Sequence, residues 1–362
     1  MSGPDLASAA PERNATVADF FEPRAADVDA GHADVRDGIA FVAGHGLAAG
    51  GIENASALIT TVARSDMASA FSAWAHRMVI GYLSLAPDRS PFRALLPDLR
   101  SGKVIGATAM AGGTARYLTG APIPVTYTWT DDGLVLDGRI PWASNLIPPF
   151  VGVTAAADRD DPDRVVVVAF TDRTPGLAVA PYPDLVALGA TGSSSIVLSR
   201  ATVPSDAVIA DALEPFVERI LPPFLLLQSA FCRGLANRSL DEAVDHLNVL
   251  GEILRQDVDR RRTAAERAGR QLDRLARRVD RLERSGRAER LDGLAIPLRD
   301  LLRLRLRWAH LAGEAVRLEL AAVGGRGYLR SAATARRLRE AAFLPIQAPT
   351  EVQLRWTLSR SA

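Results

Sequence analysis

An indole and a hydroxyl lie two residues apart at Trp142 and Ser144, and together they could bind one flat, conjugated ligand. Side chains two residues apart on a strand point to the same side of it. An indole face covers a planar ring with a large dispersion contact, and a hydroxyl adds a hydrogen bond at the ring's edge. The alternative interpretation is a core tryptophan on a strand, followed by a serine in a turn.

His76 is one of five histidines, and imidazole is well suited to hold or donate a proton near neutral pH. The pattern around it predicts a helix from Met67 to Tyr82, with Ser65 and Asp66 placed to cap its first turn. A histidine on such a helix can also lie on the surface or in the core, hydrogen-bonded to its surroundings. Both interpretations stay open at the level of sequence.

Helical and strand patterns divide the chain into four stretches. Residues 1–15 resemble a loose tail, and residues 16–100 are alanine-rich with apolar residues at three-and-four spacing. Residues 101–208 alternate and contain recurring turn signals, which predicts a compact domain of short antiparallel strands. Residues 209–362 return to a helical pattern, with one apolar seam along residues 255–290 that predicts a long helix in an antiparallel bundle. The predicted fold class is therefore α+β.

Composition argues against several kinds of partner. The 362 residues are 48% hydrophobic and 23% charged with a net charge of +1, which gives no basic excess for nucleic acid. The single Cys232 excludes an intramolecular disulfide, and no Cys/His spacing suggests a zinc site. The apolar runs are far shorter than the roughly 20 residues of a membrane helix. The N-terminus lacks a targeting pattern, so we expect a cytoplasmic protein with neither membrane nor nucleic acid as partner.

The C-terminal part carries a pattern with a known counterpart. A glycine cluster at residues 324–328 precedes Arg339-Glu340-Ala341 and then a loop at residues 345–350. This order resembles the C-terminal end of acyl-CoA dehydrogenases, and the helical, β, helical order of the chain fits the same superfamily over residues 20–356. The resemblance implies an acyl-CoA dehydrogenase-like fold: an N-terminal helical domain, a central antiparallel β-barrel-like domain and a C-terminal helical bundle. A flavin would lie between the last two.

In the β domain, residues 136–145 are similar to the family strand whose aromatic residue lies against the flavin ring and whose hydroxyl hydrogen-bonds near N5. The resemblance therefore implies flavin contacts for Trp142 and Ser144.

A glycine-containing stretch at residues 102–114 takes the place of the family's Thr-Glu-Pro-x-x-Gly-Ser-Asp loop but lacks its Glu-Pro and Ser-Asp elements. Glycines allow backbone amides to approach a flavin or a phosphate closely. We therefore expect Ala109, Met110 and Thr114 at the cofactor. A plain glycine loop between a strand and a hairpin is the alternative.

The glycine cluster resembles half of an inter-subunit flavin contact. This implies cofactor roles for Gly324, Gly325 and Arg326, with the guanidinium on a phosphate. The glycines can instead end the preceding helix. The family's Arg-x-x-Phe-Gly element, which touches FAD from a neighbouring subunit, is absent near residues 250–254. We expect FAD, with FMN as the alternative, in a homodimer or homotetramer.

The loop lacks the family's catalytic base. Ala348 and Pro349 stand where acyl-CoA dehydrogenases have Glu-Gly, and an alanine cannot take the substrate's α-proton. Three carboxylates could replace it: Glu252, near a helix position that some family members use, and Glu340 and Glu351, which flank the loop.

The monooxygenase branch of the superfamily, such as the dibenzothiophene monooxygenases, implies other roles. His76 falls where that branch carries an active-site histidine, and Ser144 where it uses a serine. Pro349 matches the proline of its His-Asp-Pro loop, in which Gln347 and Ala348 replace the histidine and the aspartate. His76, Ser144 and Gln347 are therefore candidate catalytic residues beside the carboxylates.

From these features we expect a flavin-dependent oxidoreductase acting on a small or carrier-linked organic substrate, such as an acyl thioester, as an atypical dehydrogenase. One alternative is a two-component monooxygenase that uses reduced flavin and oxygen. The other is a redox-silent binding or assembly subunit, which loss of the catalytic base would permit.

Overall fold

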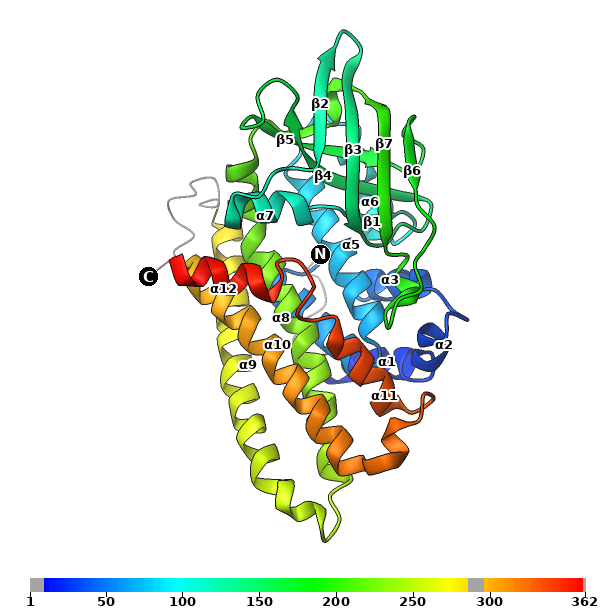
Figure 1. Cartoon of the computed structure of the whole chain (residues 1–362), viewed down its shortest axis with the longest axis vertical. Helices are drawn as coiled ribbons and strands as arrows, with labels where there is room; N and C mark the ends of the chain where they lie inside the picture. The colour runs from blue at the N-terminus through cyan, green and yellow to red at the C-terminus, as the bar shows by residue number, and fades with distance from the viewer. Residues whose placement is uncertain (1–9, 286–295, 361–362) are drawn as a thin grey trace, which may run out of the picture.

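A sheet of eight strands lies at one end of a helical bundle in the computed structural model, which describes residues 10–285 and 296–360 (Figure 1). The strands are β1 (Ile105–Thr108), β2 (Val125–Thr130), β3 (Gly133–Ala143), β4 (Phe150–Asp158), β5 (Val165–Thr171), β6 (Leu177–Val179), β7 (Ser194–Val203) and β8 (Val208–Ala210). The α-helices before and within the sheet region are α1 (Ala10–Phe21), α2 (Ala25–Asp29), α3 (Arg36–Gly44), α4 (Ile52–Ser65), α5 (Met67–Ser84), α6 (Leu96–Arg100) and α7 (Ala111–Thr119). Those after it are α8 (Leu213–Asp245), α9 (Arg255–Arg284), α10 (Leu298–Val323), α11 (Ala333–Ala342) and α12 (Glu351–Arg360).

The N-terminal helix begins earlier than the sequence predicts. α1 starts at Ala10, so residues 10–15 are helical instead of forming part of a loose tail. Val17 and Phe21 on α1 are buried, and α1 packs on α4, which stabilises the helix. Residues 1–9 lie outside the described residues.

The strand order is β6-β7-β3-β2-β4-β5-β8, and β1 pairs with β4. Most neighbours are antiparallel, as expected, but β4 runs parallel to both β1 and β2. β4 and β5 are buried along nearly their whole length, which explains the unbroken apolar run at residues 165–170. The helix α5 packs on β1 and β4, and α8 packs on β5.

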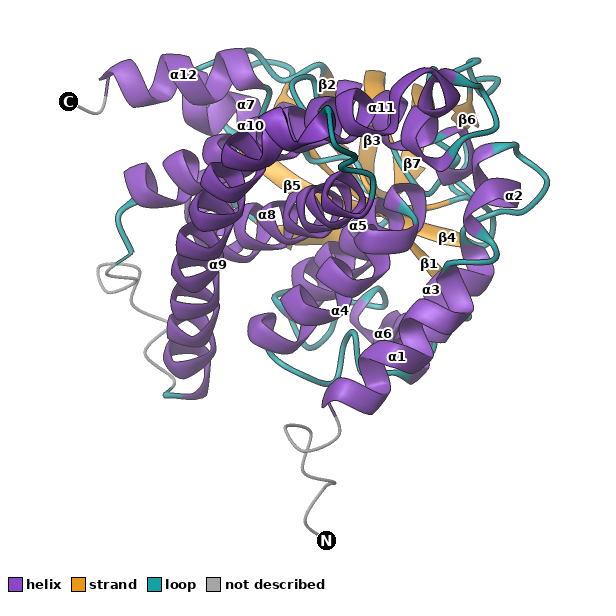
Figure 2. Cartoon of the chain, turned by 90° about the horizontal axis from the view of Figure 1, so that it is seen from below, coloured by secondary structure: helices purple, strands orange, loops and turns teal. Residues whose placement is uncertain are grey.

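The helix α8 lies at the centre of the bundle. Figure 2 shows α5 and α8 near the middle of the molecule, with α4, α9 and α10 around them. α8 continues through Pro222 and Pro223, although these residues interrupt its apolar run. The predicted seam of α9 is buried at Val258, Leu272 and Val279, and the helix ends at Arg284. Among the described residues, no helix combines the length and apolar character needed to cross a membrane.

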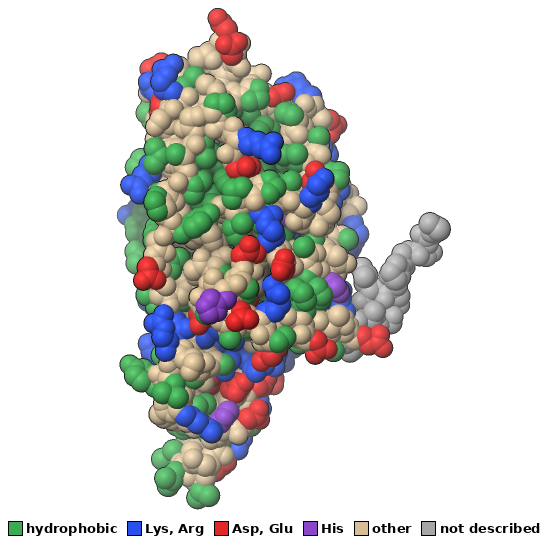
Figure 3. All heavy atoms as spheres, turned by 90° about the vertical axis from the view of Figure 1, so that its right-hand side faces the viewer, with side chains coloured by type: hydrophobic (Ala, Val, Ile, Leu, Met, Phe, Trp, Pro, Cys, Tyr) green, Lys and Arg blue, Asp and Glu red, His purple; other side chains and the backbone are tan. Residues whose placement is uncertain are grey.

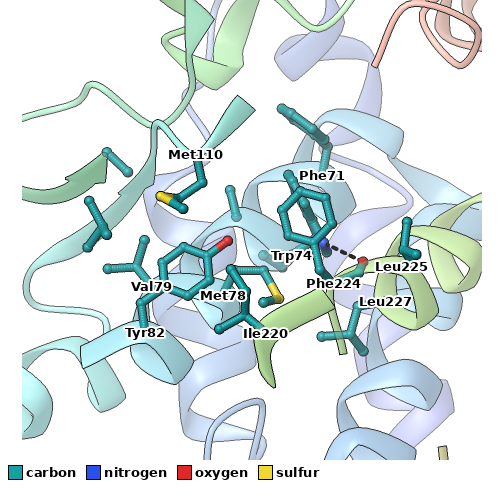
Figure 4. Close-up of a cluster of buried hydrophobic side chains, with 14 of the residues drawn as sticks. Phe71, Trp74, Met78, Val79, Tyr82, Met110, Ile220, Phe224, Leu225 and Leu227 are labelled. Carbon is teal, nitrogen blue, oxygen red and sulfur yellow. Dashed lines mark hydrogen bonds between the residues drawn. The ribbon is translucent and has the colours of Figure 1, made fainter. Parts of the chain in front are cut away.

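Aromatic side chains join α5 to α8 beneath the sheet (Figure 4). The rings of Phe71 and Trp74 stack with centroids 5.2 Å apart, and Trp74 meets Phe224 edge-on at 4.9 Å. Trp74 Nε1 also donates to the carbonyl oxygen of Phe224 at 3.3 Å, so the indole is buried without losing its hydrogen bond. This cluster therefore packs α5 firmly against α8.

Candidate cofactor site

Trp142 lies near the end of β3, and 56% of its surface is exposed. The pairing of β3 with β7 shifts register between Ile140 and Ala143, and both of these residues are buried. The tryptophan between them is therefore directed outward while its neighbours anchor the strand. An indole exposed to this extent offers a free aromatic face to a ligand.

A chain of hydroxyls leads to Ser144. Ser193 Oγ donates to Ser144 Oγ at 2.8 Å, and Thr191 Oγ1 lies 2.7 Å from Ser193 Oγ. When Ser144 accepts this bond, its own proton stays available for an acceptor on a ligand. Neither Ser193 nor Thr191 was predicted from the sequence. The run of serines at residues 193–195 could have indicated hydroxyls near Ser144. The antiparallel pairing of β3 with β7 brings this run to the end of β3.

Asn145 holds the turn that follows. Its backbone has a φ of 66°, a left-handed conformation that asparagine tolerates better than most residues. Its Nδ2 donates to the carbonyl oxygens of Ser72 at 2.9 Å and Gly106 at 3.0 Å. These bonds tie the end of β3 to α5 and β1 and thereby fix the direction of Ser144.

The stretch predicted as a glycine loop is partly helical. α7 occupies residues 111–119, with Met110 as its N-cap residue. Ala109, Met110 and Thr114 are buried, and Thr114 Oγ1 donates to the carbonyl oxygens of Met110 and Ala111, both at 3.1 Å. The side chains of these three residues serve the core, so any contact with a cofactor would come from backbone atoms.

His76 is fully buried, and the backbone occupies both nitrogens of its ring. Nε2 donates to the carbonyl oxygen of Leu99 at 2.9 Å, and Nδ1 accepts from the N–H of Gly106 at the same distance. Burial lowers the pKa of His76 to about 4, so the ring is neutral at pH 7. These contacts support the hydrogen-bonded core histidine and leave no ring atom for a catalytic role.

Glu252 lies far from Trp142. It is exposed on the short helix Gly251–Leu254 in the α8–α9 connection, at the lower tip of the molecule in Figure 1, whereas β3 lies in the upper half. Its carboxylate accepts from Arg255 at 2.8 Å, and this bond lowers the pKa of Glu252. The position does not support a role as the base for a substrate at β3.

The other two carboxylates are engaged beside the loop. Burial raises the pKa of Glu340 to about 7, and its Oε1 lies 3.6 Å from Arg336 Nε inside the molecule. Glu351 lies 3.1 Å from His310 Nε2; burial raises its pKa, but hydrogen bonds to His310 and Arg355 outweigh this and lower it.

Gln347 is buried in the loop between α11 and α12. Its Oε1 accepts from Arg305 Nη2 at 2.8 Å. Arg305 Nε in turn donates to Gln228 Oε1 at 3.0 Å, and Gln228 Nε2 donates to the carbonyl oxygen of Ala348 at 2.9 Å. α8 and α10 thus hold the loop through two amides and a guanidinium. The sequence alone gave no sign of Arg305 or Gln228.

The glycine cluster forms a short 3₁₀ helix, Gly324–Tyr328, at the end of α10. Gly324 has a φ of 71°, so the cluster does end the preceding helix, as the alternative interpretation held. Arg326 is exposed. In Figure 1 this segment lies at the lower end of the bundle, away from the sheet, so Gly324, Gly325 and Arg326 do not meet Trp142 within one chain.

Hydrophobic side chains gather over the upper half of the face in Figure 3, which is the side of the molecule that carries β6 and β7. The large hydrophobic residues exposed on β7 and on the chain leading to it are Tyr182, Val186 and Val197. Tyr182 donates to the carbonyl oxygen of Leu146, just after the turn at Asn145. This face of the molecule therefore carries exposed apolar side chains, one of which, Tyr182, reaches the chain just after the turn at Asn145.

No protein-family model matches the sequence, and no curated protein matches it. Solved structures match over nearly the whole chain. Glutaryl-coenzyme A dehydrogenase in its glutaryl-CoA complex is 16% identical with a TM-score of 0.83, covering 99% of this chain and 95% of that one. Acyl-CoA dehydrogenase from Geobacillus kaustophilus is 15% identical with a TM-score of 0.82, covering 97% of each chain. KijD3, in complex with FMN and dTDP-3-amino-2,3,6-trideoxy-4-keto-3-methyl-D-glucose, is 21% identical with a TM-score of 0.78, covering 99% of this chain and 94% of that one.

Identities this low establish the fold alone, and the fold agrees with the order of elements predicted from the sequence. The chain has the acyl-CoA dehydrogenase fold.

Proposed function

We propose that the protein is a flavin-dependent oxidoreductase whose flavin ring lies against Trp142. The proposal rests on one observation: the indole of Trp142 is exposed, and two residues later the Ser144 hydroxyl has a proton to donate. A flat, conjugated ring with acceptor atoms at its edge fits both groups. The fold supports the proposal, because KijD3 has this fold and its structure contains FMN.

A bound flavin would supply the electron transfer. The residues of this chain would bind and orient it: Trp142 covers one face of the ring, and Ser144 donates to an acceptor at the ring's edge. Asn145 keeps the turn in place through its bonds to α5 and β1. The proposed cofactor is FAD, with FMN as the alternative.

We propose a homodimer or homotetramer, and the position of the glycine cluster supports this assembly. In the folded molecule the cluster lies far below the sheet that carries Trp142 (Figure 1). It can therefore contact only a flavin that is bound at Trp142 of another copy. Arg326 would then provide a positive charge for a phosphate of the partner's cofactor.

The loop restricts the reaction. Ala348 and Gln347 place no carboxylate where a base would be needed, and the carboxylates of Glu340 and Glu351 are paired with Arg336 and Arg355. The proposed reaction is therefore an atypical dehydrogenation of a small or carrier-linked organic substrate that does not depend on a base in this loop. The lack of that base also favours a second candidate, a two-component monooxygenase using reduced flavin and oxygen.

Flavin binding tests the shared part of both candidates. Purified protein would be titrated with FAD and FMN in the oxidised state and, without oxygen, in the reduced state, with absorbance and fluorescence as readouts. We expect saturable binding of at least one form. If equilibrium dialysis shows no retained flavin in either redox state, the redox-silent alternative replaces the proposal.

A further inference from the structure

Arg305 on α10 is a fully buried cation beneath the loop. Its Nε donates to Gln228, and its Nη2 donates to Gln347 Oε1 at 2.8 Å and to the carbonyl oxygen of Leu344 at 3.3 Å. Its Nη1 is buried and has no hydrogen-bond partner. All three acceptors are neutral oxygens.

Two other buried arginines, Arg336 and Arg337, each have a carboxylate nearby. Arg337 makes two hydrogen bonds to Glu319, at 2.5 and 2.9 Å, and Arg336 Nε lies 3.6 Å from Glu340. Within residues 10–285 and 296–360, no carboxylate lies within ion-pair distance of Arg305. A guanidinium stays charged at any physiological pH, so burying it without a counter-ion is costly in free energy.

The thiol of Cys232 does not provide the missing charge. Burial raises the pKa of Cys232 to about 11, even though the positive charge of Arg305 lowers it. The thiol is therefore neutral at pH 7, and the positive charge of Arg305 remains uncompensated by it.

A second donor without a partner belongs to the amide that Arg305 binds. Gln347 Nε2 is buried and has no hydrogen-bond partner, while Oε1 of the same amide accepts from Arg305. The two free donors, Arg305 Nη1 and Gln347 Nε2, thus belong to groups joined by one hydrogen bond. One carboxylate could accept from both, with one oxygen on each nitrogen.

We propose that Arg305 and Gln347 form a buried binding site for the carboxylate of an organic acid. The bound anion would provide the negative charge that Arg305 lacks nearby. It would also accept hydrogen bonds from both free donors. Its entry requires the loop to move, and the loop lies at the surface, where Ile346 is 69% exposed. If the proposed flavin chemistry is correct, the carboxylate belongs to the substrate, because this loop stands where the resemblance places the catalytic base.

Thermal unfolding in the presence of anions tests the site without using activity. Acetate, malonate and glutarate would be titrated against the flavin-free and the flavin-loaded protein at constant ionic strength, with chloride and phosphate as inorganic probes. We expect a saturable rise in Tm with at least one carboxylate, since a ligand of the native state stabilises it by mass action. No saturable rise with any carboxylate, or an equal rise with chloride, would overturn the proposal.

Variants locate the effect. Arg305→Met should weaken carboxylate binding by at least about tenfold, since a charge-assisted hydrogen bond is lost. Arg307→Gln is the matched control, because it removes the same charge from an exposed position on the same helix and should leave binding unchanged. Unchanged binding in Arg305→Met, or equal losses in both variants, would show that the site lies elsewhere.

Gln347→Glu keeps the test decisive if Arg305→Met does not fold. The near-isosteric carboxylate supplies an internal counter-ion to Arg305, so the variant should unfold at a higher Tm than the wild type and lose the response to added carboxylates. A retained response would overturn the proposal. Flavin titration of the wild-type protein separates the two hypotheses, since absent flavin binding there would remove the proposed function while leaving the carboxylate site tested.

Discussion

Asp280 on α9 caps the first turn of α4 by accepting from the backbone N–H of Ile52 at 2.6 Å through Oδ1. Its Oδ2 accepts from the N–H of Glu53 at 3.0 Å. The N-cap residue of α4 is Gly51, which has no side chain to bind these donors. A carboxylate 228 residues further along the chain therefore provides the cap and joins the N-terminal helices to the bundle.

We predict that Asp280→Ala lowers the free energy of unfolding by about 1–2 kcal/mol, the cost of losing a helix cap. Urea denaturation would measure the change. Glu266→Ala on the same helix is the control. The exposed carboxylate of Glu266 makes a long ion pair with Arg270, at 3.9 Å, and should contribute less than about 0.5 kcal/mol. Similar losses in the two variants would contradict the capping role.

Trp142→Ala should weaken flavin binding by about 1–3 kcal/mol, or roughly 5- to 150-fold in Kd, because the stacked indole face is removed. Trp129→Ala is the matched control: Trp129 is 43% exposed, on β2, and pairs with Leu134 at the other end of β3. Isothermal titration of both variants would measure the effect. Equal losses, or no loss in Trp142→Ala, would move the flavin away from β3.

The sequence predicted the order of helices and strands because periodicity and turn residues act locally. The pairing of Trp142 with Ser144 at one ligand stays a prediction, because β3 ends at Ala143 and its register shifts between Ile140 and Ala143. Asp280, Arg305 and Ser193 were not predicted. Each acts on a partner brought close only by the tertiary fold, and no local pattern distinguishes Arg305 from the many solvated arginines nearby. For His76, the sequence left two interpretations open, and the fold supports the core interpretation through the backbone of Leu99.

His76 should make stability depend on pH in a defined direction. Its pKa is lowered from 6.5 to about 4 in the folded protein, so the unfolded chain binds more protons between these values. The stability contributed by neutral His76 is therefore present above about pH 6.5 and is lost as the pH falls toward 4, by on the order of 3 kcal/mol in total.

A comparison with His76→Asn isolates this effect. Burial raises the pKa of Glu340 to about 7, which gives the opposite pH dependence, but that contribution is common to both proteins. Urea denaturation at several pH values should show the stability advantage of the wild type shrinking as the pH falls from 7 to 4.5. An advantage independent of pH would contradict a neutral, buried His76.

The α8–α9 connection should contact another copy of the chain. Three large apolar side chains are exposed together there: Val249 at 92%, Leu250 at 85% and Ile253 at 84%. Clustered exposed apolar residues of this kind mark an interaction surface. We predict that light scattering gives a multiple of 38.7 kDa for the wild type and a smaller assembly for Leu250→Glu combined with Ile253→Glu. Val186→Glu, at another exposed apolar residue, is the control; a monomeric wild type would contradict the prediction.

Straight-chain acyl-CoA thioesters should not be dehydrogenated at a useful rate. Removal of the α-proton needs a positioned base, which typically contributes a factor of about 100 to 10,000, and Ala348 provides none. Butyryl-CoA added to the flavin-loaded protein without oxygen should therefore leave the flavin absorbance unchanged. Rapid bleaching would show that a displaced carboxylate acts as the base. Glu340→Gln and Glu351→Gln would then identify it, since only the variant lacking that base should fail to bleach.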